Sequence, residues 1–232
     1  MMLKIVLGVL LTAVIVFGFG LPMSPHPQTW YELPVIPGLE QKARIIFFHV
    51  PTAWLSVVAF LTSMVYAIQY LRKRDLRYDI RSSAAAGLGF MFCILATLTG
   101  AVWAKFNWGS FWNWDPRETS IFVLLLIYGA YFSLRAAVEV EEKRATLSSV
   151  YSIIAAVTVP FFVFIMPRIM TGLHPGAKGD PEGAGPVIEF KMSPNMRVVF
   201  FSSLIAFTML FIWILSLRVR TARLEYHHQQ KG

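Results

Sequence analysis

The sequence is poor in charged residues and in cysteine. Charged residues make up 15% of the 232 positions, whereas soluble globular domains carry roughly 25%. Cys93 is the single cysteine, which excludes a fold stapled by disulfide bonds. Hydrophobic residues account for 56% of the chain, and the mean hydropathy is +0.58. A soluble fold of this size could not cover so much apolar surface, so the composition indicates an integral membrane protein.

Two motifs that would define other protein classes are missing. No G-x-x-x-x-G-K-[ST] sequence occurs, so the chain carries no P-loop for ATP hydrolysis. No C-x-x-C-H sequence occurs either, so the protein is not itself a c-type cytochrome. The net charge of +8 would in another setting suggest nucleic acid. Here the basic residues cluster between apolar runs, which indicates membrane topology and contact with lipid, and we expect no nucleic-acid partner.

Six apolar stretches are long enough to cross a membrane as helices, which takes about 20 mostly apolar residues each. They are residues 5–21, 45–71, 84–104, 121–138, 150–170 and 198–217. We therefore predict one all-α domain over residues 1–232, with six transmembrane helices. The first stretch is longer than the apolar part of a signal peptide, so we expect it to be retained. Pro160 and Pro167 predict a bend in the fifth helix.

Lysine and arginine are unevenly distributed between the two ends of the predicted helices. Thirteen of the 21 lie at the N-terminus, in segments 72–83 and 135–149, and in the polar tail 218–232. The positive-inside rule places this side, with both chain ends, in the cytoplasm. The opposite side then carries the longer segments 22–44, 105–120 and 171–197. Because long loops in compact proteins are often functional, we expect the functional site on that outer, periplasmic side.

The middle outer segment is rich in tryptophan. Trp108, Trp112 and Trp114 fall within seven residues, followed closely by Asp115 and Arg117. An aromatic belt at the membrane interface would explain the tryptophans alone. A flat apolar ligand with charged groups would explain them together with the adjacent charges, since it needs aromatic faces and a cation for its carboxylates.

Two of the five histidines fall at the outer edge of the predicted membrane domain. His49 opens the second apolar stretch and His174 follows the fifth, 125 positions later. Taken singly, each is typical of a packed interfacial residue. Taken together beside the tryptophans, they would suit axial coordination of a haem iron.

The stretch from Trp108 to Thr119 resembles the tryptophan-rich "WWD" signature of haem-handling proteins in cytochrome c biogenesis. With six predicted helices and modest length, the chain resembles the CcmC type, the haem-delivery subunit of the cytochrome c maturation system. In that family a histidine opening the second helix and another in the last outer loop are the axial ligands, and His49 and His174 occupy those positions. Residues 115–119 are closer to the CcsA-type cytochrome c synthetases, which are usually longer and carry a further histidine pair inside the membrane.

The resemblance implies a bacterial inner-membrane protein that holds haem b non-covalently at its periplasmic face through His49 and His174. Trp108, Trp112 and Trp114 would line the porphyrin. Arg117 would pair a propionate, with Lys105 or Arg168 as other candidates, and we expect Asp115 to order the loop by accepting backbone N–H bonds. The resemblance further implies transfer of haem to a periplasmic chaperone of the CcmE type, together with ABC-type subunits of the maturation system, and no enzymatic activity of its own.

Four other functions remain open at this stage. A CcsA-like synthetase would attach haem directly to apocytochrome. A respiratory b-type haemoprotein would usually place histidines inside its helices, and an ABC permease would need a larger cytoplasmic coupling element. A purely structural subunit would need none of these features.

Overall fold

Helices form nearly all of the part of the chain that the computed structural model describes, residues 2–36, 39–174, 177–178 and 192–229. The helices are α1 (Met2–Gly20), α2 (Ile46–Lys73), α3 (Leu76–Trp108), α4 (Pro116–Ala137), α5 (Glu141–Pro160), α6 (Met166–Ile169) and α7 (Pro194–Gln229). A 3-10 helix, Glu40–Ile45, leads into α2. Two short parallel strands, β1 (Met23–Ser24) and β2 (Leu33–Pro34), pair between α1 and α2.

Six helical segments within the described residues are long and apolar enough to cross a membrane. This confirms the predicted all-α membrane fold with six spanning helices. The predicted ends were wrong, because hydropathy detects only the part of a helix that lies in hydrocarbon. For example, α3 covers residues 76–108 where 84–104 was predicted, and the tail from residue 218 continues α7 to Gln229.

The connections are correspondingly shorter than predicted. The tryptophan segment leaves the helix only between Gly109 and Asp115, and the segments 72–83 and 135–149 shrink to 74–75 and 138–140. Asp75 caps α3 by accepting a hydrogen bond from the backbone N–H of Arg77, which lets the helix start well before its apolar part.

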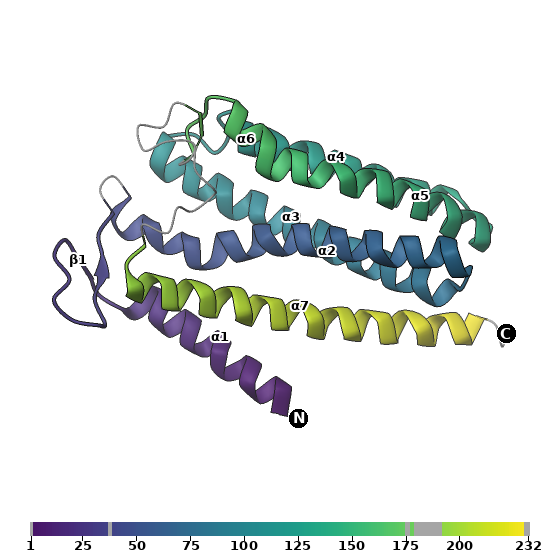
Figure 1. Cartoon of the computed structure of the whole chain (residues 1–232), viewed down its shortest axis with the longest axis horizontal. Coiled ribbons are helices and arrows are strands. Elements are labelled where there is room, and N and C mark those ends of the chain that lie inside the picture. The colour runs from purple at the N-terminus through teal and green to yellow at the C-terminus, as the bar shows by residue number, and fades with distance from the viewer. Residues whose placement is uncertain (1, 37–38, 175–176, 179–191, 230–232) are drawn as a thin grey trace.

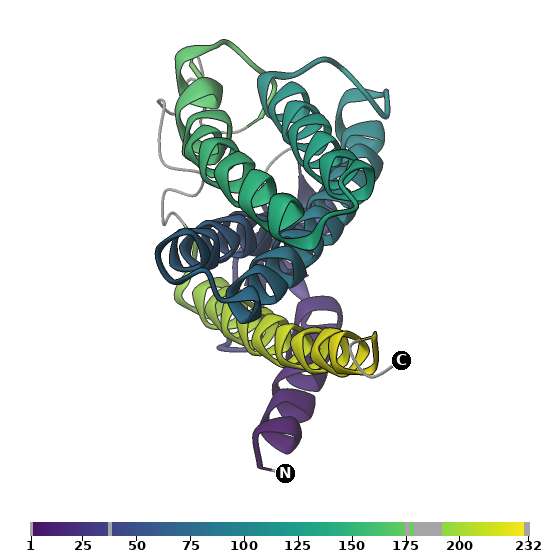
Figure 2. The same cartoon turned by 90° about the vertical axis from the view of Figure 1, so that its right-hand side faces the viewer.

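The helices lie in three pairs along the longest axis of the molecule (Figures 1 and 2). The antiparallel pair α2 and α3 occupies the centre, α4 and α5 cover one side of it, and α1 and α7 cover the other. We call the end that carries residues 21–36, 109–115 and 170–174 the tryptophan end, and the opposite end, with residues 74–75 and 138–140, the basic end.

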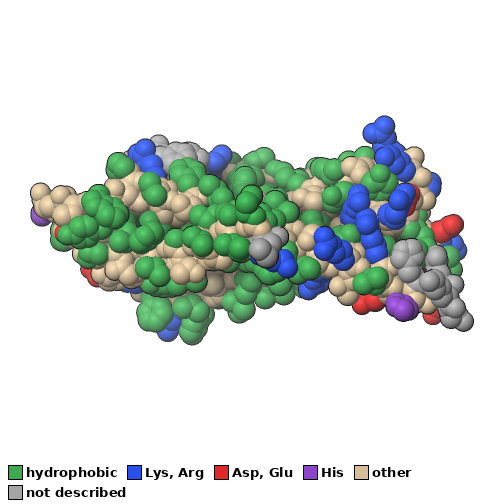
Figure 3. Space-filling view, turned by 90° about the horizontal axis from the view of Figure 1, so that it is seen from below, with side chains coloured by type: hydrophobic (Ala, Val, Ile, Leu, Met, Phe, Trp, Pro, Cys, Tyr) green, Lys and Arg blue, Asp and Glu red, His purple; other side chains and the backbone are tan. Residues whose placement is uncertain are grey.

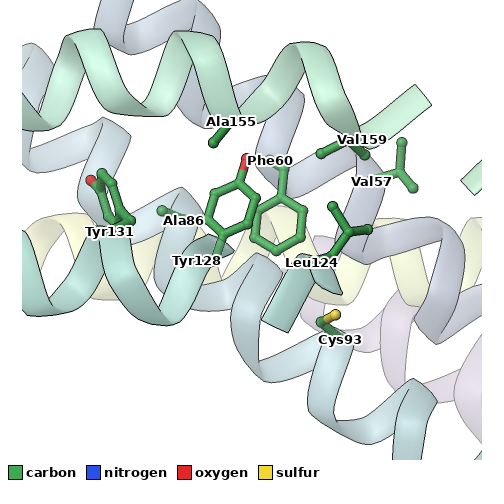
Figure 4. Packing of buried hydrophobic residues seen from close by; sticks show 9 residues of the cluster. All are labelled: Val57, Phe60, Ala86, Cys93, Leu124, Tyr128, Tyr131, Ala155 and Val159. Carbon is green, nitrogen blue, oxygen red and sulfur yellow. The ribbon is translucent and has the colours of Figure 1, made fainter. Parts of the chain in front are cut away.

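Aromatic side chains fill the core between the central pair and the α4–α5 pair (Figure 4). The Phe60 ring of α2 stacks on Tyr128 of α4, with ring centroids 3.5 Å apart. Gly89 of α3 makes this possible, since a Cβ there would lie 2.5 Å from the Phe60 ring. Because lipid tails are as apolar as the helix surfaces, the hydrophobic effect does not drive membrane helices together, and close packing of this kind stabilises their association instead.

Buried polar groups add cross-links between the helices. The Ser63 hydroxyl of α2 lies 3.0 Å from that of Ser82 on α3 and 2.9 Å from that of Ser152 on α5. Near the basic end, Arg135 of α4 donates two hydrogen bonds to the Asp79 carboxylate of α3, at 2.7 and 2.8 Å. Both partners of this ion pair are largely buried, with side-chain exposures of 15% and 7%.

The fifth membrane segment is irregular where its two prolines lie. After Pro160 the chain forms a π-helix, Phe161–Ile165, before α6 begins and places Pro167 in its first turn. A proline lacks the N–H that an α-helix needs, so the wider turn accommodates the missing bond. The irregular part of the fifth membrane segment therefore lies at Pro160 and Pro167, where the sequence predicted a bend.

Charges and apolar side chains separate along the long axis (Figure 3). Hydrophobic side chains cover much of the visible middle of the molecule, and most of the visible lysines and arginines gather toward the basic end. The uneven distribution of basic residues in the sequence thus corresponds to one physical end of the bundle.

Removing one partner of the buried Asp79–Arg135 pair leaves an uncompensated charge, so Asp79→Ala should lower the free energy of unfolding by about 3 kcal/mol. Denaturant titration in detergent measures this loss. Glu141→Ala is the control, because its pair with Arg144 is exposed and spans 3.8 Å. Equal losses in the two variants would contradict the assignment.

Candidate functional site

His49, the fourth residue of α2, packs against α3 near the tryptophan end. Its Nδ1 lies 2.9 Å from the Thr99 hydroxyl oxygen, and that hydroxyl lies 2.8 Å from the Leu95 carbonyl. Since the single hydroxyl hydrogen is committed to Leu95, we assign Nδ1 as the donor to Thr99. The unprotonated Nε2 of His49 therefore keeps its lone pair for another partner.

Gly100 makes room for the His49 ring. A Cβ at this position would lie 3.1 Å from Cε1 of the imidazole, which is tighter than an ordinary contact. The ring can therefore lie directly against α3 and reach Thr99, one position earlier on the same helix.

His174 is held from the other side of the site by Asp115. Its Nδ1 lies 2.7 Å from Asp115 Oδ1, and the Asp115 side chain is only 1% exposed. An ionised carboxylate can only accept hydrogen bonds, so Nδ1 of His174 is the donor. Here too Nε2 is left with a free lone pair.

Asp115 owes its position to the start of α4. It is the N-cap residue, Pro116 follows in the first turn, and Glu118 completes a capping box. The Asp115 carboxylate also accepts hydrogen bonds from the backbone N–H groups of Arg117, at 2.9 Å, and Leu173, at 2.6 Å. The expected backbone hydrogen bonds are thus present, and the bond to His174 is an addition that sequence reasoning missed.

A second glycine permits the approach of the His174 loop to Asp115. A Cβ at Gly172 would lie 2.7 Å from Asp115 Oδ2 and 3.0 Å from Cδ of Pro116. The small residue lets the backbone of residues 172–174 come close enough for the Leu173 N–H to reach the carboxylate.

The surroundings of Asp115 keep it ionised. Burial by itself would raise its pKa, but the hydrogen bond and charge of His174 and the N–H groups of Arg117 and Leu173 oppose this effect. Together they lower the pKa of Asp115 to about 2. A full negative charge therefore faces the Nδ1–H of His174 at neutral pH.

The tryptophans of the predicted motif divide into two groups. Trp108, which lies in the last turn of α3, meets the His174 ring edge to face, with centroids 4.7 Å apart. Trp112 and Trp114 instead pack on each other at 5.8 Å, and with Phe122 they line a separate apolar hollow. The ring contacts of Trp108 are thus with Trp103 and His174, and those of Trp112 and Trp114 are with each other and with Phe122.

Trp103 is an aromatic neighbour that sequence reasoning missed. Its ring lies 5.9 Å from that of His174 and 4.9 Å from that of Trp108. It precedes the motif by one and a half turns of α3, and this helical spacing was the only available signal. Its indole Nε1 is buried without a hydrogen-bond partner among the described residues.

Two arginines lie close to this group. Arg117 of α4 interacts electrostatically with Arg168 of α6, with Asp115 and with His49. The Nε atoms of both arginines are buried and lack hydrogen-bond partners within the described part of the chain. Lys105, by contrast, donates to the Gly109 carbonyl at 2.9 Å. The two guanidinium groups are therefore the stronger candidates for binding an anion.

The last turns of α3 bring the two histidines to one place. Gly100, beside His49, and Trp103, beside His174, are three positions apart and so share a face of the helix. His174 is also close enough to His49 that a charge on one ring would act on the other. His26 and His228 are exposed elsewhere.

The described residues contain no group of three or more histidine, cysteine or carboxylate side chains arranged to hold a metal ion. Two imidazoles alone supply only two ligands. They suit an iron whose other ligands come with it, as the four ring nitrogens of a porphyrin do.

Comparison with known proteins identifies the family of this chain. The CcmC family, described as heme exporter protein C, matches residues 6–231. The chain belongs to the CcmC family. It is 30% identical to heme exporter protein C of Paracoccus denitrificans over 184 residues, which cover 77% of this chain and 72% of that protein. The corresponding protein of Rhodobacter capsulatus is 29% identical over 192 residues, 83% of this chain and 77% of its own length.

A second group of relatives is named CcsA, the family that residues 115–119 resemble. The cytochrome c biogenesis protein CcsA of Pelargonium hortorum is 33% identical over 114 residues, 49% of this chain but 35% of that protein. The resemblance to haem-handling proteins of cytochrome c biogenesis is thus confirmed, for the CcmC type and for the CcsA type. This CcmC-family chain is a multi-pass membrane protein, and the roles of its individual site residues remain predictions.

The depressed pKa of Asp115 predicts an acid dependence of stability in the haem-free protein. Its contribution to stability is complete above the unfolded pKa, near 4, and is lost as the pH falls to about 2. The shift corresponds to about 2 kcal/mol. Unfolding of the wild type and of Asp115→Asn in detergent, compared across this window, should converge toward the acid side. A constant difference between them would contradict the prediction.

Proposed function

We propose that this CcmC-family protein holds haem b non-covalently between His49 and His174 and passes it to a periplasmic chaperone of the CcmE type. One observation carries the proposal. Each imidazole donates its Nδ1–H to a protein acceptor, which orients the ring and leaves the Nε2 lone pair for iron. The relatives that match most of the chain are named heme exporter protein C, which supports haem as the cargo.

The groups around His174 suit a porphyrin. Trp103 and Trp108 offer aromatic surface beside the ligand, and this contact favours a flat apolar macrocycle. Arg117 and Arg168 are half-buried, and each has a buried Nε–H without an acceptor among the described residues, which suits the two propionates of haem. Trp112 and Trp114 pack on each other, and Trp114 is exposed, so we assign them to the protein surface around the site, where they are available to the haem edge or to a partner.

The distribution of basic residues supports a periplasmic position for the site. If the basic end faces the cytoplasm, as the positive-inside rule requires, the tryptophan end faces the periplasm of a bacterial inner membrane. Haem held there would be available to a soluble or anchored chaperone on that side.

The chain supplies no energy source for the transfer. Because it has no P-loop motif, ATP hydrolysis belongs to other components, and ABC-type subunits of the maturation system are the partners that we propose. In this scheme the protein binds, orients and releases haem, and only coordination bonds to the iron form and break.

His49→Ala and His174→Ala should each abolish the low-spin haem spectrum of the purified protein, because each removes one axial ligand. Optical spectra of the detergent-solubilised protein, loaded with haem, measure this directly. His26→Ala is a matched control, since that histidine is exposed and distant from both ligands in the sequence. An unchanged Soret band in both ligand variants would overturn the axial assignment.

Arg117→Ala should lower the haem content less than either histidine variant does, because it removes one partner of a propionate and leaves both axial ligands. The Soret absorbance per protein measures this loss. Complete loss of haem would show that Arg117 holds the loop instead.

A CcsA-like synthetase, which attaches haem to apocytochrome directly, is the second candidate because of the match to CcsA. Reconstitution separates the two functions. We expect the haem-loaded protein, together with its ABC-type partners, to transfer haem to the chaperone and to leave apocytochrome unmodified when the chaperone is omitted. Covalent haem on apocytochrome without any chaperone would favour the synthetase.

A further inference from the structure

The two histidines have different hydrogen-bond partners at Nδ1. His174 donates to the Asp115 carboxylate at 2.7 Å, whereas His49 donates to the neutral Thr99 hydroxyl at 2.9 Å. The two imidazoles therefore have hydrogen-bond acceptors of different charge.

An anionic acceptor changes the donor strength of an imidazole. A carboxylate draws the Nδ1 proton toward itself and increases the electron density on Nε2, so the ring becomes a stronger metal ligand. A hydroxyl oxygen carries no net charge. The Thr99 hydroxyl also gives its own hydrogen to the Leu95 carbonyl, at 2.8 Å, so it serves His49 only as a neutral acceptor.

The environment of Asp115 keeps the carboxylate ionised and fixed in place. Its side chain is 1% exposed, so solvent screens its charge little. The carboxylate is fixed by the backbone N–H groups of Arg117 and Leu173, and it caps α4, whose N-terminus favours a negative charge. Asp115 thus holds His174 in one orientation through a rigid helix end.

Resting on the proposed function, we propose that His174 is the axial ligand that keeps the iron, and that His49 is the ligand displaced when haem leaves. In that exchange the bond between iron and His49 Nε2 breaks, and the lone pair stays on the nitrogen. An incoming ligand atom donates its own lone pair to the vacated position, so no oxidation or reduction is involved. Asp115 acts in this scheme as a positioning residue for His174 and does not contact haem.

Single-histidine variants test the order of the two ligands. His49→Gly leaves His174 as the protein ligand, and His174→Gly leaves His49. Each variant is loaded with ferrous haem, and resonance Raman spectroscopy measures the stretching frequency of the iron–histidine bond. We expect a higher frequency in His49→Gly than in His174→Gly, because the carboxylate-bonded ring binds iron more strongly.

Asp115→Asn and Thr99→Val identify the cause of the difference. Asparagine remains a good N-cap, so Asp115→Asn removes the charge while it keeps the start of α4. We expect it to lower the frequency in the His49→Gly background and to leave it unchanged in the His174→Gly background. Thr99→Val is the matched control and should affect only the His174→Gly background. A merely structural role of Asp115 would not produce this selective shift.

The reduction potential of the haem-loaded protein with both histidines tests the same ordering, and it is used where a single-histidine variant retains no haem. We expect Asp115→Asn to raise the potential more than Thr99→Val does, since an anionic partner stabilises ferric iron. For a wild type with a bis-histidine spectrum, two results would overturn this ordering and leave the proposed function standing. One is equal Raman frequencies in the two single-histidine variants, and the other is a change in potential for Asp115→Asn that is equal to or smaller than that for Thr99→Val. A protein that binds no haem at all would overturn the proposed function, and the ordering with it.

Discussion

The hydrogen bond from His174 to the Asp115 carboxylate joins the parts of the tryptophan end that form the site. It connects the start of α4 to the segment that follows α6, across 59 positions of sequence. The same carboxylate receives the backbone N–H groups of Arg117 and Leu173, and the missing side chain of Gly172 allows that approach. One buried, ionised group therefore caps a helix, anchors a loop and determines which nitrogen of an imidazole is free.

The membrane explains why the site lies where it does. Inside hydrocarbon every backbone group must be paired within a helix, so irregular backbone that can turn a side chain toward a ligand is restricted to the helix ends. The candidate site draws on four such ends: the start of α2, the last turns of α3, the start of α4 and the segment after α6. The bundle interior provides rigidity instead, through the Phe60–Tyr128 stack and the Asp79–Arg135 pair.

Parts of this arrangement could be predicted from the sequence, for clear physical reasons. Apolar runs predict membrane helices because lipid is a uniform solvent, but they do not predict where a helix ends, so Trp108 was expected in a loop and lies in α3. The backbone hydrogen bonds of Asp115 could be predicted, because helix capping is local. Thr99, Gly100 and Trp103 carried no comparable signal, since their roles depend on what packs against α3.

The sequence by itself determined the membrane class, the six spanning helices and the uneven distribution of basic residues, because these follow from composition summed over short segments. Only the tertiary structure decided that His174 pairs with Asp115 and His49 with Thr99. It also decided that Trp108 contacts Trp103 and that Trp112 and Trp114 pack on each other. Such pairings depend on how helices cross in space, and residues 50 to 60 positions apart leave no periodic pattern that would reveal them.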